Sequence, residues 1–476
     1  TTHKVFNLST KTSRTIMRGN KSYSYADGDQ YFQWSPDGQW FLVDFNQENH
    51  WIGEVGLVSA KGNADVINLT QSGYEDSNGK WMMNGKMMIW FSDRDGMKNH
   101  ASWGAQVDVY GMFFTQSAFD RFKLTEEDYK LLREKEDGEK GEKNATTTEA
   151  EKSKPRGGVT EKVPDQLRID LRGLEDRKVK LTIHSSILGD AVLSKDGEKL
   201  YYLARFEKGV DLWVTNLRTR ETKVITKVGD NGSSLTIDKE GKNLFLLAEG
   251  KPLKIQIEPY KKEAVEINGE MLLNKRGEMA YIFDHAWRQV KKKFYVADLH
   301  GVDWNFYRQE YSKFLPHISN NWEFSEMLSE MLGELNASHT GCNYNPDQRN
   351  KDATASLGLV YDQNYKGDGL RVADVIAKGP FDRAGSKVKK GVIIEMIDNS
   401  RLVADVDFYQ LLNRKNDHNT LVSLYDPSSK ARWEEVVKPI SLNEERNLLY
   451  ERWVACRAHQ VDSLSKGKIG YIHVRG

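Results

Sequence analysis

Residues 32–43 decide the fold of the N-terminal half of the chain, and they read FQWSPDGQWFLV. Two runs rich in aromatic and aliphatic residues flank Ser-Pro-Asp-Gly, a pattern that predicts two β-strands joined by a tight turn. Asp-Gly suits such a turn because the backbone there takes positive φ angles, at which glycine carries no steric penalty. Similar turns between β-rich runs recur along the chain, and the turn glycines stand at positions 38, 85, 197 and 241.

The spacing of these glycines predicts a β-propeller. The successive intervals are 47, 112 and 44 residues. A propeller blade takes about 40–45 residues, so two intervals correspond to single blades and the third to two blades plus an insertion. We therefore interpret residues 1–270 as a partial, all-β propeller of about five blades.

The insertion is expected at residues 123–162, where 21 of 40 residues are charged. A run with so few apolar residues buries too little surface to offset its ordering entropy. We expect a solvated loop that lies between two blades, because strand-like sequence resumes at residues 167–171. A docking element for a partner is the alternative interpretation.

Residues 274–350 are predicted to form a small α-helical domain. Apolar residues recur there at the three- and four-residue spacing of an amphipathic helix, at Met279, Ile282, Phe283, Ala286, Trp287 and Val290. A second apolar stripe runs from Phe324 to Leu332, and Asn320 or Asn321 is expected to cap its helix. The domain ends in GELNASHTG, residues 333–341, which contains a Ser-His pair.

The last part of the chain returns to strands. Residues 352–440 contain four β-rich runs and the phrase KGPFDRAG at 378–385, a combination that resembles a PDZ domain. PDZ domains of this group usually have Gly-Asp where this chain reads Gly391-Val392. The difference affects a residue of a turn and no residue that contacts a ligand. Residues 442–476 are expected to form a helix and then a strand at 469–474, the start of a further α/β domain.

Composition limits the function classes. The chain has 476 residues, enough for about three domains, and 69 basic residues balance 69 acidic ones, so no nucleic-acid partner is implied. No apolar run of 18 residues occurs, which argues against a membrane segment. Two cysteines, Cys342 and Cys456, exclude a disulfide framework, and the histidines lack metal-site spacing, so we expect no catalytic metal.

The landmarks together resemble the tricorn protease family, serine peptidases related to C-terminal processing proteases. The landmarks are the propeller-like repeats, HGVDW at 300–304, LNASH at 335–339, the PDZ-like segment and GKIGYIHV at 467–474, in this order. The resemblance implies four successive parts: propeller blades, the helical domain with the Ser-His motif, the PDZ-like domain and the start of an α/β catalytic domain. It also implies that the chain is an internal fragment of a longer protein.

The resemblance further implies a catalytic role for two residues. His339 is expected to act as the general base of a serine peptidase, and Ser338 to join the same charge-relay network. The nucleophilic Ser, the oxyanion hole and a Glu partner would lie beyond Gly476. Oligopeptides or unfolded chains are the implied substrates, a homo-oligomeric ring the implied assembly, and no cofactor is needed. A cytoplasmic location is implied, or a periplasmic one if the full N-terminus carries a signal.

Several alternatives stay open from the residues alone. A Ser-His pair also suits a capping Ser beside an exposed His. Leu357, Gly358 and Leu359 stand where PDZ domains offer backbone N–H groups to a peptide carboxylate, yet the domain could merely space its neighbours. A prolyl-oligopeptidase-type enzyme would need a Gly-x-Ser-x-Gly elbow, which the chain lacks. A non-catalytic propeller/PDZ scaffold that binds peptides or proteins is the remaining rival.

Overall fold

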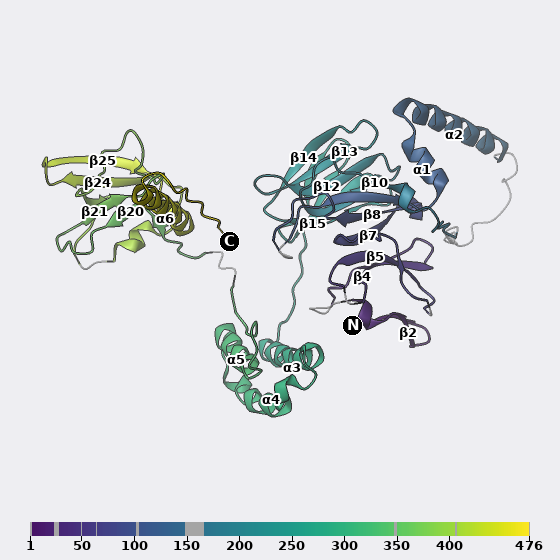
Figure 1. Ribbon diagram of the computed structural model, residues 1–476, viewed down its shortest axis with the longest axis horizontal. Coiled ribbons are helices and arrows are strands. Elements are labelled where there is room, and N and C mark those ends of the chain that lie inside the picture. The colour runs from purple at the N-terminus through teal and green to yellow at the C-terminus, as the bar shows by residue number, and fades with distance from the viewer. Residues whose placement is uncertain are drawn as a thin grey trace. The chain divides into compact units, whose positions relative to one another are not determined.

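The computed structural model describes residues 2–22, 28–48, 50–62, 64–100, 104–147, 166–346, 350–404 and 407–475. The chain divides into two compact units, Thr1–Trp304 and Asn305–Gly476. The first unit is mostly antiparallel sheet, and the second combines helices with a β-rich domain (Figure 1).

Consecutive strands form the sheets of the first unit. A two-stranded sheet comes first, from β1 (His3–Phe6) and β2 (Ser13–Met17). The next two four-stranded sheets comprise β3 (Phe32–Trp34), β4 (Trp40–Asn46), β5 (Gly53–Ser59) and β6 (Ile67–Asn68), then β7 (Asp76–Met82), β8 (Met87–Ser92), β9 (Asp108–Phe113) and β10 (Lys178–Lys180). Two more comprise β11 (Ile187–Leu193), β12 (Lys199–Arg205), β13 (Val210–Asn216) and β14 (Thr222–Gly229), then β15 (Gly232–Ile237), β16 (Asn243–Ala248), β17 (Lys251–Gln256) and β18 (Lys261–Ala264).

The predicted hairpin at residues 32–43 is confirmed. Gly38 has a φ of 67°, and Phe32, Gln33 and Trp34 pair with Val43, Leu42 and Phe41. The Asp37 carboxylate accepts hydrogen bonds from the Ser35 hydroxyl at 2.6 Å and from the Gln39 amide at 3.1 Å. This local network closes the turn, which explains why the sequence alone identified it.

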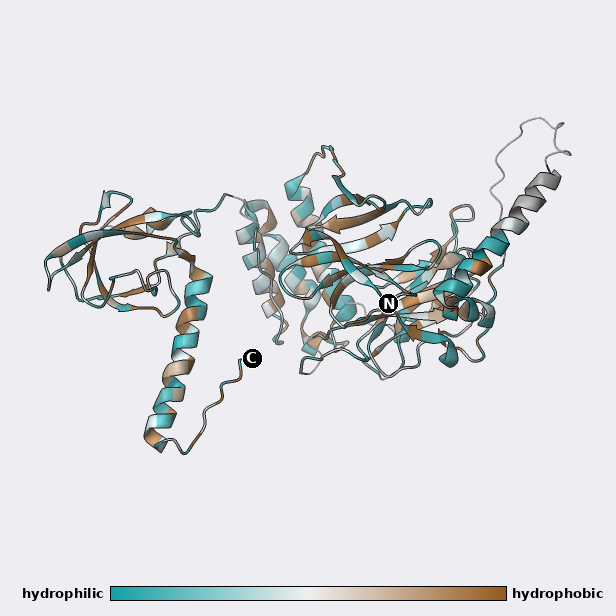
Figure 2. Cartoon of the chain, turned by 90° about the horizontal axis from the view of Figure 1, so that it is seen from above, coloured by the Kyte–Doolittle hydropathy of each residue, from teal (hydrophilic) through white to brown (hydrophobic). Residues whose placement is uncertain are grey.

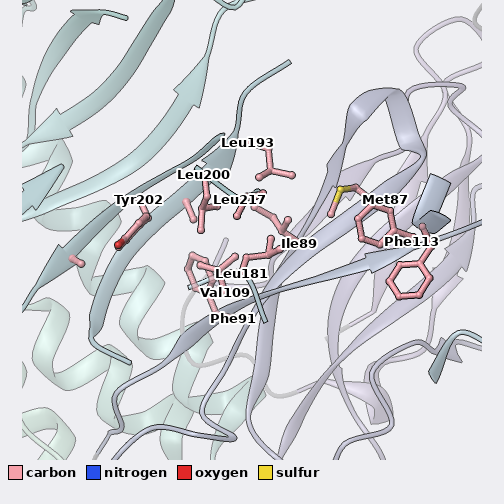
Figure 3. Close-up of a cluster of buried hydrophobic side chains, with 13 residues drawn as sticks. Met87, Ile89, Phe91, Val109, Phe113, Leu181, Leu193, Leu200, Tyr202 and Leu217 are labelled. Carbon is pink, nitrogen blue, oxygen red and sulfur yellow. The ribbon is translucent and has the colours of Figure 1, made fainter. Parts of the chain in front are cut away.

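Neighbouring sheets pack against each other through apolar side chains. Figure 3 shows one cluster, in which residues of β8, β9 and the chain after β10 meet residues of β11, β12 and the chain after β13: Met87, Ile89, Phe91, Val109, Phe113, Leu181, Leu193, Leu200, Tyr202 and Leu217. Similar clusters join the sheet of β3–β6 to that of β7–β10, and the sheet of β11–β14 to that of β15–β18. Burial of these faces between consecutive sheets is the main source of stability in this unit.

The charged insertion lies within one sheet, which corrects the expectation that it separates two blades. It leaves after β9 and returns at β10, which pairs with β9. The buried guanidinium of Arg177 donates to the Phe113 carbonyl at 2.9 Å and to the Asp170 carbonyl at 2.5 Å. These bonds link the returning chain to the strand that it left. The 112-residue interval therefore spans one enlarged sheet, because Gly85 and Gly197 stand in turns of successive sheets.

The first part of the insertion is helical and not a loop. Helix α1 (Gln116–Lys123) ends where the insertion begins, and the insertion itself starts with α2 (Glu126–Thr147). Tyr129 of α2 is buried, and the guanidinium of Arg218 lies 3.8 Å from its ring centroid. Arg218 also donates to the Leu124 carbonyl at 2.5 Å and to Glu198 at 2.9 Å. The expectation of a loop was wrong for this segment because its contacts with distant residues compensate for its low apolar content. Residues 148–162 lie outside the part of the chain that the structure describes.

The predicted amphipathic helix is confirmed as α3 (Lys275–Lys293). The Asn274 side chain caps it by accepting a hydrogen bond from the Gly277 amide at 3.0 Å, and Met279 and Phe283 are buried. Two tryptophans then exchange hydrogen bonds. The Trp287 indole donates to the Trp304 carbonyl at 2.9 Å, and the Trp304 indole donates to the Trp287 carbonyl at 3.0 Å.

Two helices, α4 (Trp304–Ser312) and α5 (Asn321–Gly333), precede the β-rich domain of the second unit. Asn320 caps α5 as predicted, because its side chain accepts a hydrogen bond from the Glu323 amide at 3.0 Å. Four residues of the predicted apolar stripe of α5 are buried: Phe324, Met327, Leu328 and Met331.

The β-rich domain is built from one larger sheet and one short strand pair. The larger sheet has the order β20 (Leu359–Tyr361), β21 (Leu370–Val375), β22 (Ile393–Ile397), β24 (Thr420–Asp426) and β25 (Ala431–Val437), with β23 (Ser400–Arg401) paired to β22. The short pair joins β19 (Ala355–Ser356) to β26 (Ile440–Ser441). Its apolar core includes Leu357, Leu359, Val372 and Ile394. The PDZ-like assignment stays a prediction.

A long helix, α6 (Leu442–Ser465), follows directly from β26 and starts with a capping box between Ser441 and Glu444. None of its residues is buried, and Figure 2 shows hydrophobic and hydrophilic residues following one another along its length. The strand expected at residues 469–474 is not formed. A strand needs a neighbour to complete its hydrogen bonds, and none among the described residues pairs with this segment, whose Ile472 is 89% exposed.

Candidate functional site

The end of α5 sets the position of the Ser-His pair. Leu335, two residues after the helix, is only 1% exposed and anchors the chain. Its amide donates to the Leu332 carbonyl at 3.3 Å, and the Asn336 amide donates to the Gly333 carbonyl at 3.0 Å. Asn336 then takes a φ of 48°, a left-handed conformation that turns the chain away from the helix axis.

Ser338 and His339 lie on this turn and are both exposed. His339 also has a positive φ of 58°, and the Thr340 hydroxyl closes the turn by donating to the Ala337 carbonyl at 3.0 Å. Neither the Ser338 hydroxyl nor the His339 ring bonds to another side chain within the part of the chain that the structure describes. The imidazole is thus open to a group that another segment brings to it.

A pair of tyrosines that the sequence interpretation missed holds the end of α5. Glu334 follows α5 directly, and its carboxylate accepts a hydrogen bond from the Tyr311 hydroxyl on α4 at 2.8 Å. The same carboxylate raises the pKa of Tyr307, one turn earlier on α4. The three residues carry no sequence signal of their own, since ordinary surface tyrosines and glutamates have the same spacing.

The predicted peptide-binding loop is compact. The side chains of Leu357 and Leu359 are buried in the core of the β-rich domain. Gly358 has a φ of 65°, and a Cβ atom there would lie 2.6 Å from Cδ of Pro380. The Gly358 amide already donates to the Ser356 hydroxyl at 2.9 Å, and its carbonyl accepts from the Ile376 amide at 3.1 Å.

Helix α6 reaches this loop with an acidic side chain. The Ser356 hydroxyl donates to the Glu445 carboxylate at 2.5 Å. Two ion pairs hold the same helix to the domain: Lys378 with Glu451 at 2.7 Å, and Arg452 with Asp374 at 2.5 Å. A carboxylate of the chain itself therefore bonds Ser356, the residue directly before the predicted peptide-binding loop.

Known proteins that resemble this chain include a tricorn domain family and several tricorn proteases. The Tricorn protease C1 domain family matches residues 276–333. The tricorn protease of Thermoplasma acidophilum is 26% identical over 311 residues, which cover 63% of this chain and 28% of that protein. The chain resembles tricorn proteases over about two thirds of its length. Tricorn protease homolog 1 of Streptomyces coelicolor is 22% identical over 342 residues, 64% of this chain and 31% of that protein.

The tricorn fold extends over nearly the whole chain. The crystal structure of the tricorn protease superposes with a TM-score of 0.66 and 15% sequence identity, covering 99% of this chain and 45% of that one. The consecutive four-stranded sheets of the first unit therefore form a propeller-like part of a multidomain tricorn architecture. The chain spans less than a third of the length of these two curated relatives, and the C1 match ends six residues before His339.

A polar cavity of about 490 Å³ lies within the propeller-like part, lined by inner-strand residues of several sheets. Lys80 of β7 and Asp190 of β11 form an ion pair at 2.5 Å beside it, and Asp190 also accepts from the Leu235 amide at 2.7 Å. Asp44 accepts from the Asn78 amide at 2.9 Å. Burial, together with the nearby charge of Glu75, raises the pKa of Asp44 to about 7.

Among the described residues, no group of three or more His, Cys, Asp or Glu side chains is arranged to hold a metal ion. No helix in the described ranges is both long and apolar enough to cross a membrane.

Proposed function

We propose that the protein that carries this chain is a tricorn-like serine peptidase, which hydrolyses peptide bonds in oligopeptides or unfolded chains. The observation that carries the proposal is the exposed imidazole of His339, presented on a left-handed turn directly after the C1-matching helices. The resemblance to tricorn proteases supports the reaction class. The coverage of the relatives leaves room for the remaining catalytic groups outside these 476 residues.

In the proposed reaction, the neutral imidazole of His339 accepts the proton of a serine nucleophile as the hydroxyl attacks the peptide carbonyl. The same ring then donates this proton to the leaving amine. Ser338 would join the relay between the imidazole and a carboxylate. The nucleophile, the oxyanion donors and the carboxylate are supplied by residues outside this chain, and so is the pocket that selects the substrate. Assembly into a homo-oligomeric ring is part of the same proposal.

The test uses the natural full-length protein with the change His339→Ala, assayed on fluorogenic peptides. His317→Ala is the matched control, because His317 is also exposed in the helical region. Loss of a serine hydrolase's general base costs several powers of ten in rate. We expect that loss for His339→Ala, an unchanged melting temperature, and normal turnover for His317→Ala. Near-normal turnover of the His339 variant would leave the non-catalytic scaffold as the better interpretation.

A further inference from the structure

The carboxylate of Glu334 is the point at which two elements of the helical region meet. Glu334 is the C-terminal cap residue of α5, and Tyr307 and Tyr311 are one turn apart on α4. The Tyr311 hydroxyl donates to this carboxylate at 2.8 Å, and the carboxylate also raises the pKa of Tyr307. We call these three residues the tyrosine clamp. It fixes the end of α5 to α4 five residues before His339.

The turn that carries His339 has few other restraints. Leu335 is buried, but Asn336 and His339 both take left-handed backbone angles and are exposed. The hydroxyl of Thr340 makes a local hydrogen bond within this turn, to the Ala337 carbonyl. Leu335 and the clamp therefore both restrain the direction in which the turn leaves α5.

We propose that Glu334, held by Tyr307 and Tyr311, is a positioning residue for His339. The inference rests on the proposed function, because it assigns a means of orienting that same base. A general base works only within hydrogen-bond reach of the proton that it accepts. A displacement of about 1 Å in an active site can cost roughly 100-fold in rate. Without the clamp, the last turn of α5 is free to fray and the imidazole loses its fixed approach.

The clamp keeps its hydrogen bonds over the pH range in which peptidases work. Burial and the hydrogen bond to Glu334 raise the pKa of Tyr311 to about 12, so its hydroxyl retains the donated proton. The carboxylate of Glu334 acts only as a hydrogen-bond acceptor in the clamp. An amide oxygen accepts the same bonds, so Glu334→Gln preserves the clamp, whereas Glu334→Ala removes it. This difference separates positioning from a general need for charge.

The test uses the full-length protein, four variants and a count of competent active sites by a serine-directed fluorophosphonate probe. The variants are Glu334→Ala, Glu334→Gln, the Tyr307→Phe/Tyr311→Phe pair, and Glu326→Ala as a control on an exposed face of α5. For Glu334→Ala and for the tyrosine pair we expect kcat per titrated site to fall about 10-fold to 100-fold, with KM and melting temperature close to wild type. Glu334→Gln should keep most of the activity, and Glu326→Ala all of it.

Two results would overturn the inference. One is a normal kcat per titrated site in Glu334→Ala while His339→Ala is inactive; the proposed function would then stand without the clamp. The other is a loss that appears only as fewer titrated sites and a lower melting temperature, which assigns the clamp to folding alone. Activity in His339→Ala would instead refute the proposed function itself, so the two failures are distinguishable.

Discussion

The Ser356 hydroxyl and the Glu445 carboxylate, 89 residues apart in sequence, are joined by a hydrogen bond of 2.5 Å. Through it, helix α6 places a carboxylate at the loop that the sequence marked for peptide binding. Because the Ser356 hydroxyl also accepts a hydrogen bond from the Gly358 amide, the loop and the helix belong to one hydrogen-bond network. Any peptide that uses this loop must therefore compete with the helix.

We expect that peptides with a free C-terminal carboxylate bind this domain weakly until Glu445 is removed. Glu445→Ala frees the Ser356 hydroxyl and takes away a negative charge, so peptide affinity should rise several-fold. Fluorescence anisotropy with labelled peptides measures the change, and Glu434→Ala, on the distant β25, is the control. Equal affinity in wild type and Glu445→Ala would show that the loop is not a carboxylate receptor.

The stability of the propeller-like part should depend on the ionisation of Asp44. The pKa of Asp44 is about 7 in the folded protein, above its ordinary value of 3.8. The folded state therefore binds this proton more tightly than the unfolded state does, and the resulting stabilisation is fully present below about pH 4. It is lost as pH rises from about 4 through 7. A shift of this size corresponds to on the order of 4 kcal/mol. Asp44→Asn should flatten the decline in unfolding free energy over this range, whereas the exposed control Glu48→Gln should leave it unchanged.

The ion pair between Lys80 and Asp190 should contribute more than an exposed pair. Its side chains are 15% and 13% exposed and join β7 to β11 of the next sheet. Lys80→Ala leaves a largely buried carboxylate without its cation, at a cost of about 3 kcal/mol. Lys98→Ala breaks the pair with Asp93, where the lysine is 43% exposed, and should cost below about 1 kcal/mol. Denaturant titration of both variants measures the difference; equal losses would contradict it.

Helix α2 should detach from the sheets when its aromatic anchor is removed. Tyr129→Ala deletes the ring beneath Arg218, a contact worth about 1–2 kcal/mol. Tyr129→Phe keeps the ring and should behave as wild type. Timed trypsin digestion should cleave the alanine variant faster at Lys130 and Arg133 than either other protein. Identical digestion rates for all three would mean that Tyr129 does not anchor the helix.

Local patterns were predictable from the sequence. The Asp37-Gly38 hairpin, the apolar stripe of α3 and the Asn320 cap each depend on residues within a few positions of one another. The insertion was misplaced because its position depends on Arg177, which returns to Phe113 across 64 residues. Helix α2 was missed for the same reason, since Arg218 contacts it from the distant turn between β13 and β14.

The candidate site divides in the same way. Ser338 and His339 were singled out from their own motif, and they stay proposals. Glu334 stands beside the motif, but its partner Tyr311 lies 23 residues earlier, and only the folded geometry brings them together. The segment at 469–474 has strand-like residues without a strand partner among the described residues, so its sequence alone could not decide its conformation.

The segment that contains α1 and α2 lies between two paired strands of one sheet, and this position has a consequence for protein engineering. Loop-closure entropy grows slowly, by about 0.6 kcal/mol for each doubling of loop length. Because Arg177 and the pairing of β9 with β10 re-establish the sheet on return, the length between them matters little to its stability. A fluorescent reporter spliced after Thr147 would thus travel with the protein while both strands keep their register.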